Sequence, residues 1–136
     1  MKLRLLDILA CPIDKTWPLK CFSFEEGKNV IEKLPQMDED TNLICRYYCG
    51  KYQKILFDEE KQKTTEEAKK INYDKDCKGC LSNEIISGII QCPKCENYYP
   101  IIEEIPMMLK EELRNEEIER DFTSKWSEKI KELLVK

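Results

Sequence analysis

The chain has 136 residues, of which 37% are charged, and a formal net charge of −4. This length predicts one domain with a modest core and argues against a large catalytic architecture. The acidic balance argues against an autonomous nucleic-acid binder, which needs a basic surface to neutralise phosphates. Because the chain has no histidine, Ser-His and Cys-His nucleophilic catalysis are excluded.

The first half of the chain carries signals for four elements. They are a short helix over residues 3–10, a strand over 17–24, a short helix over 28–34 and a longer helix over 40–57. Pro12 ends the first helix, since proline cannot continue a helical hydrogen-bond ladder. The longest helix has the clearest signal, because its apolar residues recur at i, i+3, i+4 and i+7 and Asp40 can serve as its N-cap.

The second half predicts a different order of elements. It comprises a polar helix over 58–73, a loop over 74–83, strands over 85–91 and 98–102, and an amphipathic C-terminal helix. Thr64 and Glu67 have capping-box spacing in the polar helix. Asn115 can cap the C-terminal helix, whose apolar side chains recur mainly every four positions and indicate a docking face rather than a catalytic one.

These elements predict an α+β fold. Residues 1–27 and 84–110 should form a small antiparallel β-sheet domain of the zinc-knuckle type, built from both chain ends. Residues 28–83 should form a mostly helical central insertion, and residues 111–136 a C-terminal amphipathic helix.

The start of the chain also gives an expectation for the cellular location of the protein. Lys2, Arg4 and Asp7 interrupt its apolar run, which is therefore not a signal peptide, and no run reaches transmembrane length. We therefore expect a cytoplasmic protein without membrane contact, in which eight cysteines indicate metal or redox chemistry. The abundance of Lys, Glu and Ile is typical of thermophiles, and an archaeal source is expected, so intracellular disulfides are also possible.

A C-P-x-C turn joins the last two predicted strands and directs the thiolates of Cys92 and Cys95 at one centre. Cys11, which also precedes a proline, has similar surroundings, so the two chain ends should meet there. A complete second knuckle would place a cysteine at Asp14. Carboxylate oxygen binds zinc at about 2.0–2.2 Å, so the predicted ligands are Cys11, Asp14, Cys92 and Cys95, with weakened zinc binding. Buried thiols or one disulfide are the alternatives.

Four further cysteines lie in the central segment. Cys45 and Cys49 are one turn apart on the predicted 40–57 helix, where a loop carrying Cys77 and Cys80 can meet them. They can form two disulfides, which we favour, or a second zinc site, or remain free thiols. The C-x-x-C pair also matches thiol oxidoreductases, but those place it after a strand of a βαβ unit, whereas here it follows a polar helix. The role of Cys21 stays open.

The segment after the last predicted strand has the character of an interface. Pro106 cannot donate a ladder hydrogen bond and belongs on a sheet edge, and adaptable apolar side chains follow it at Met107, Met108 and Leu109. An exposed edge with such side chains is typical of strand-addition interfaces. The alternative is a final strand tucked into the core.

The runs LLDILACP near the start and IISGIIQCPKCENYYPIIEEIPMML near the end, taken in this order, resemble the family of small zinc-knuckle activator subunits of methyltransferases. The resemblance implies a non-catalytic partner of S-adenosylmethionine-dependent enzymes that modify tRNA, rRNA or translation release factors. Such a subunit forms a heterodimer with a Rossmann-like methyltransferase, so S-adenosylmethionine is bound only through the partner.

The resemblance places metal ligands at Cys11, Cys92 and Cys95, and it departs from the family pattern at Asp14. It also places partner contacts at apolar positions near both ends of the chain. These positions are Leu6, Ile8, Leu9, Ile105, Pro106, Met107, Met108 and Leu109. Two other functions remain open: a zinc-ribbon module of a transcription or translation complex, and a thiol redox protein.

Overall fold

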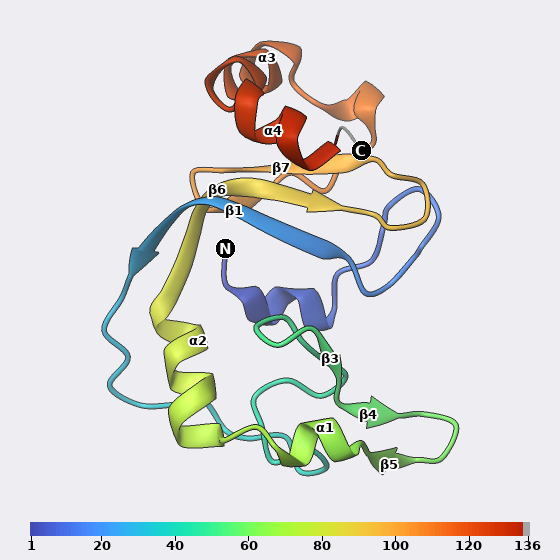
Figure 1. The fold of residues 1–136 in the computed structure, drawn as a ribbon, viewed down its shortest axis with the longest axis vertical. Helices are drawn as coiled ribbons and strands as arrows, with labels where there is room; N and C mark the ends of the chain where they lie inside the picture. The colour runs from blue at the N-terminus through green and yellow to red at the C-terminus, as the bar shows by residue number, and fades with distance from the viewer. Residues whose placement is uncertain (135–136) are drawn as a thin grey trace.

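The computed structural model describes residues 1–134; residues 135 and 136, the end of the predicted C-terminal helix, lie outside this description. The fold is α+β, as predicted. Figure 1 shows helices α3 (Glu116–Lys125) and α4 (Ser127–Leu134) on one side of a sheet, with the blue N-terminal helix and the central region on the other. Within residues 1–134, no helix has the length and apolarity needed to cross a membrane.

The sheet has four antiparallel strands in the order β1-β6-β7-β8. Their bounds are Lys20–Lys28 for β1, Asn83–Gln91 for β6, Tyr98–Ile102 for β7 and Ile105–Pro106 for β8. Strands from the two parts of the chain thus pair directly, and β1 runs along almost the whole of β6. Gly88 permits this close approach, because a Cβ at that position would lie only 2.4 Å from the Phe22 carbonyl oxygen.

Both faces of the sheet are covered by apolar side chains. Neighbouring residues of a strand point to opposite faces, so Ile89 packs against Phe122 and Ile130 of the C-terminal helices while Ile90 faces the N-terminal side. That side holds the first core: Met1, Leu6, Cys11, Leu19, Tyr48, Ile85, Ile90, Cys92, Tyr99 and Ile101. Burial on both faces accounts for the continuous apolar run of β6.

The predicted N-terminal helix is present as the 3-10 helix η1 (Leu3–Asp7). Its Asp7 carboxylate accepts three backbone N–H groups from the start of the central region. The donors are Arg46 at 3.0 Å and Tyr47 and Tyr48 at 2.7 Å each. The carboxylate therefore fixes the central region against η1.

The central region consists of short elements. They are β2 (Tyr48–Cys49), β3 (Lys54–Ile55), β4 (Phe57–Asp58), β5 (Lys63–Thr64), α1 (Glu66–Lys69), the π-helix η2 (Tyr73–Cys77) and α2 (Lys78–Ser82). The helices predicted over 28–34 and 40–57 are wrong, the 58–73 helix shrinks to α1, and the predicted 74–83 loop is η2 and α2. The apolar residues of 40–57 serve two packing sites, because Tyr48 enters the first core whereas Leu43 and Leu56 join Ala68 in a second core.

The C-terminal segment follows the prediction more closely. The Asn115 side chain accepts the N–H of Ile118 at 3.1 Å, which confirms Asn115 as the N-cap of α3. The single predicted helix is interrupted at Trp126, whose ring packs on Phe24 with centroids 5.3 Å apart. A short 3-10 helix, η3 (Glu111–Leu113), precedes α3. The apolar stripe thus docks on the chain's own sheet.

Candidate metal centre

The first turn of the candidate metal centre spans residues 11–16. The carbonyl of Cys11 accepts the N–H of Lys15 at 2.9 Å, and the N–H of Cys11 donates to the carbonyl of Thr16 at 3.0 Å. Lys15 adopts the left-handed conformation, with φ of 63°. This backbone places the side chains of positions 11 and 14 on the same side of the turn.

The second turn, over residues 92–97, repeats these bonds. The Cys92 carbonyl accepts the N–H of Glu96 at 3.0 Å, and the Cys92 N–H donates to the Asn97 carbonyl at 3.0 Å. Glu96 matches Lys15 in conformation, with φ of 65°. Asp14 therefore occupies the place in the first turn that Cys95 holds in the second.

The two turns bring the four predicted ligands together. Their ligand atoms all lie within 4.8 Å of one another. Cys11 Sγ lies 3.7 Å from Cys95 Sγ, and Cys92 Sγ lies 3.6 Å from each Asp14 carboxylate oxygen. Sulfurs at about 2.3 Å from a tetrahedral zinc ion are roughly 3.8 Å apart. The donor set of three thiols and one carboxylate can therefore hold a metal ion such as zinc.

Asp14 is held ready to accept a cation. Hydrogen bonds from the Thr16 backbone N–H, at 3.0 Å, and from the Thr16 side chain keep the pKa of Asp14 well below its usual range. The Asn97 N–H plays the equivalent part for Cys95 by lowering its pKa, but desolvation and the Cys92 and Cys11 thiols outweigh it and raise the pKa to about 11. The carboxylate is thus charged at neutral pH, whereas the Cys95 thiol is charged only when a cation replaces its proton.

A buried tyrosine contacts one of the predicted ligands. The Tyr99 hydroxyl lies 3.2 Å from Cys11 Sγ, and Tyr99 is completely buried under the Arg114 guanidinium. Burial alone would raise the pKa of Cys11, but the hydrogen bonds from Tyr99 and from the Asp14 and Ile13 backbone lower it. Sequence reasoning missed Tyr99, although a tyrosine in a buried strand beside a C-P-x-C turn needs a polar partner for its hydroxyl.

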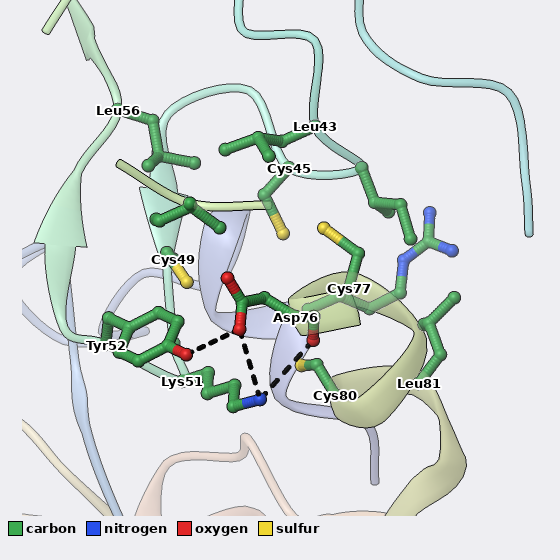
Figure 2. Close-up of a pocket in the computed structure, with 14 residues that line it drawn as sticks. Leu43, Cys45, Cys49, Lys51, Tyr52, Leu56, Asp76, Cys77, Cys80 and Leu81 are labelled. Atoms are coloured by element: carbon green, nitrogen blue, oxygen red, sulfur yellow. Dashed lines mark hydrogen bonds and ion pairs between the residues drawn. The ribbon is translucent and has the colours of Figure 1, made fainter. Parts of the chain in front are cut away.

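The central cysteines gather around a different site. Cys45, Cys49, Cys77 and Cys80 all line one cavity of about 20 Å³ (Figure 2). All eight cysteines of the chain are free thiols in the described residues, so the structure gives no support to the disulfides favoured above. Burial raises the pKa of Cys77, and it raises that of Cys80 to about 11, whereas thiol oxidoreductases need a lowered pKa. Cys21 is a half-buried thiol against the first core, and burial raises its pKa to about 12.

The structure separates the predicted partner contacts into two groups. Leu6 is only 2% exposed and belongs to the first core, so its predicted place on a surface is wrong, and Leu9 and Met108 pack partly against the same core. Ile8 is 71% exposed and Ile105 57% exposed, and Leu109 is exposed as well. Pro106 and Met107 are half-buried.

An apolar groove lies next to the exposed part of this segment. Ile102, Met107, Leu109 and Ile118 contribute to its lining, and its volume is about 50 Å³. Leu113 of η3 and Ile118 of α3 are exposed nearby in the chain and were not predicted as contact residues. The sequence signal for both residues is an apolar side chain near the start of the C-terminal helix that does not pack against the sheet.

The first part of the chain matches a known protein family. Residues 2–63 match the family described as Trm112p-like protein. The matched range contains Cys11 and Asp14 of the first turn and ends before Cys77. No curated protein matches the chain.

Proposed function

We propose that this chain, whose residues 2–63 match the Trm112p-like family of methyltransferase activators, is a non-catalytic subunit that binds and stabilises Rossmann-like methyltransferases. The substrates of these enzymes would be tRNA, rRNA or a translation release factor. The observation that carries the proposal is an exposed apolar surface beside the last strand of the sheet. We call it the β8 surface: Ile105, Met107, Leu109, Leu113 and Ile118.

The β8 surface offers apolar side chains to a partner. Ile105, Leu109, Leu113 and Ile118 are each exposed by more than two fifths, and Met107, Leu109 and Ile118 line the apolar groove. Exposed apolar side chains that continue into a groove are typical of interaction sites. Burying them would contribute roughly 25 cal/mol per Å² of apolar area removed from water.

The backbone of this edge restricts how a partner strand can pair. β8 is the last strand of the sheet and pairs with β7 alone. Pro106 has no N–H, and the N–H of Met107 already donates to the Pro100 carbonyl at 2.8 Å. A partner strand would find few free donors here, so we infer that hydrophobic contact provides more of the affinity than strand pairing does.

The candidate metal centre is connected to this surface through β7. Its second turn leads directly into β7, and β7 and β8 form a tight hairpin. Zinc bound by Cys11, Asp14, Cys92 and Cys95 would cross-link the two chain ends, and it would have no catalytic part. S-adenosylmethionine would be bound by the methyltransferase.

The test is co-expression with tRNA and release-factor methyltransferases, followed by measurement of binding and of methyl transfer from labelled S-adenosylmethionine. Ile105→Asp should weaken binding by on the order of a hundredfold, because an unpaired charge in a desolvated interface costs several kcal/mol. The matched control is Val30→Asp, since Val30 is an apolar residue that is 90% exposed and lies between β1 and β2. Circular dichroism should show both variants folded.

Two outcomes would contradict the proposal. In one, Ile105→Asp binds and activates the enzymes as well as the control does, which would remove the β8 surface from the interface. In the other, the chain captures only ribosomal or polymerase components and raises no methyltransferase activity, which would favour a zinc-ribbon module.

A further inference from the structure

We propose that Cys45, Cys49, Cys77 and Cys80 form a second site for a thiophilic divalent metal ion such as zinc. The site is separate from the centre at the chain ends and does not depend on the proposed function. Its ligands would be four thiolates, with no carboxylate.

The spacing and the convergence of the four cysteines support this proposal. Cys45 and Cys49 have the spacing C-x3-C around β2, and Cys77 and Cys80 have the spacing C-x2-C across η2 and α2. Both spacings are common in structural zinc sites. Figure 2 shows the sulfurs of Cys45 and Cys77 turned toward each other across the cavity, with Cys49 and Cys80 on its wall.

The central region has only a small core of its own. Its second core contains three buried residues, Leu43, Leu56 and Ala68. Each of its strands is two residues long, and α1 and α2 are four and five residues long. Segments of this size with so little buried apolar surface usually need a disulfide or a metal to fold. The four cysteines are the groups that can supply such a cross-link, and they are free thiols.

The charges around the cavity also suit a metal–thiolate cluster. A zinc ion with four thiolates carries a net charge of about −2, which an apolar cavity alone would not stabilise. Arg4 and Lys51 line the same cavity and bring positive charge to it. Asp76 also lines it, but its carboxylate already accepts the Tyr52 hydroxyl at 2.7 Å and the Asn72 N–H at 2.8 Å.

The ligands must move by a small amount to bind an ion. Among residues 1–134, only the group at the chain ends has its ligand atoms within 4.8 Å of one another. The central sulfurs must therefore approach one another across the cavity of about 20 Å³ that they line. A structural zinc ion releases enough binding free energy to drive such a rearrangement.

The test is the zinc content of the full chain by native mass spectrometry after purification with zinc. The wild type should carry about two zinc ions per chain, and Cys80→Ser about one. Cys21→Ser is the matched control, because Cys21 belongs to neither group, and it should keep both ions. Replacement by cobalt should give thiolate-to-cobalt absorption that falls by more than half in Cys80→Ser, since four of the seven proposed sulfur ligands are lost.

A measurement on the unmodified chain guards against misfolding of the variant. The metal-loaded wild type is treated with an alkylating reagent, with and without a chelator, and the modified cysteines are mapped. Zinc should protect Cys45, Cys49, Cys77 and Cys80, and the chelator should remove this protection. Alkylation of these thiols at the same rate in both conditions would overturn the proposal. So would cross-linked peptides showing disulfides between them, or a single zinc ion per chain in the wild type that Cys80→Ser also retains.

Discussion

The carboxylate of Asp7 should be one of the most important single groups for stability. Its Oδ1 accepts the N–H groups of Tyr47 and Tyr48 at 2.7 Å each, and its Oδ2 accepts the N–H of Arg46 at 3.0 Å. These bonds join η1 to β2 and to the two residues before it, some forty positions away in the chain. The substitution Asp7→Ala removes all three acceptors at once.

The magnitude follows from the strength of such bonds. A hydrogen bond to a charged acceptor contributes about 1.5–3 kcal/mol. Bonds that share one carboxylate are not additive, and Asp7 is half-buried, so water can replace part of what is lost. We expect Asp7→Ala to lower the free energy of unfolding by about 2–4 kcal/mol. Asp7→Asn keeps one oxygen but turns an NH2 group toward the Arg46 N–H, so it should cost about 1–2 kcal/mol.

Urea unfolding of the metal-loaded chain, followed by circular dichroism, measures these differences. Asp121→Ala serves as the control, because Asp121 is an exposed carboxylate on α3, and it should change stability by less than about 0.5 kcal/mol. The reasoning is refuted if Asp7→Ala unfolds within about 0.5 kcal/mol of the control. An order in which Asn costs more than Ala would also contradict the assigned acceptor role.

Two further outcomes are expected. Asp14→Cys should raise zinc retention at the chain-end centre when a chelator competes, because a fourth thiolate replaces the carboxylate at the position equivalent to Cys95. Equal zinc retention in the wild type and the variant would count against Asp14 as a ligand. For Glu84, burial raises the pKa, but hydrogen bonds from Lys2 and from the N-terminal amine outweigh it and lower the pKa below its ordinary value of 4.5. The stabilisation is then present above pH 4.5 and lost as the pH falls through the lower folded value. Glu84→Gln should therefore cost about 1 kcal/mol at pH 7 and almost nothing near pH 2, as urea titrations at both pH values would show.

The parts of the fold that the sequence predicts correctly are those with local signals. The β-branched run of β6, the C-P-x-C turn and the strand after it give both strands and the second knuckle. Asn115 with the acidic residues after it gives the start of α3. The similar surroundings of Cys11 and Cys92 also predict that the four side chains of the candidate metal centre lie together, because two such turns have the same backbone hydrogen bonds.

The prediction of a helix over 40–57 is wrong, and the spacing of its apolar residues could not have shown this. Its apolar residues are divided between two cores, so their regular spacing does not define one face. The chain reverses at Asn42 and Gln53, which take left-handed φ values of 58° and 56° without the glycine that usually marks such turns. Gly50 was one signal against a regular helix, because a Cβ at this position would lie 2.7 Å from the Leu3 carbonyl oxygen. A glycine inside a helical pattern can indicate close backbone approach rather than a weakened helix.

The sheet and the central region differ in how much they would depend on a metal. The sheet has buried side chains on both faces, and its strands pair over long stretches, so zinc at the chain ends would add a cross-link to a unit that packing already holds. The turn around Asp14 is likewise held by the backbone bonds of Cys11. A weaker ligand is therefore tolerable there, since the folding free energy does not rest on it. The central region has no comparable core. A metal bound by the central cysteines would supply folding free energy directly. This favours four strong thiolate ligands in the central region, whereas the chain-end centre can tolerate the carboxylate of Asp14.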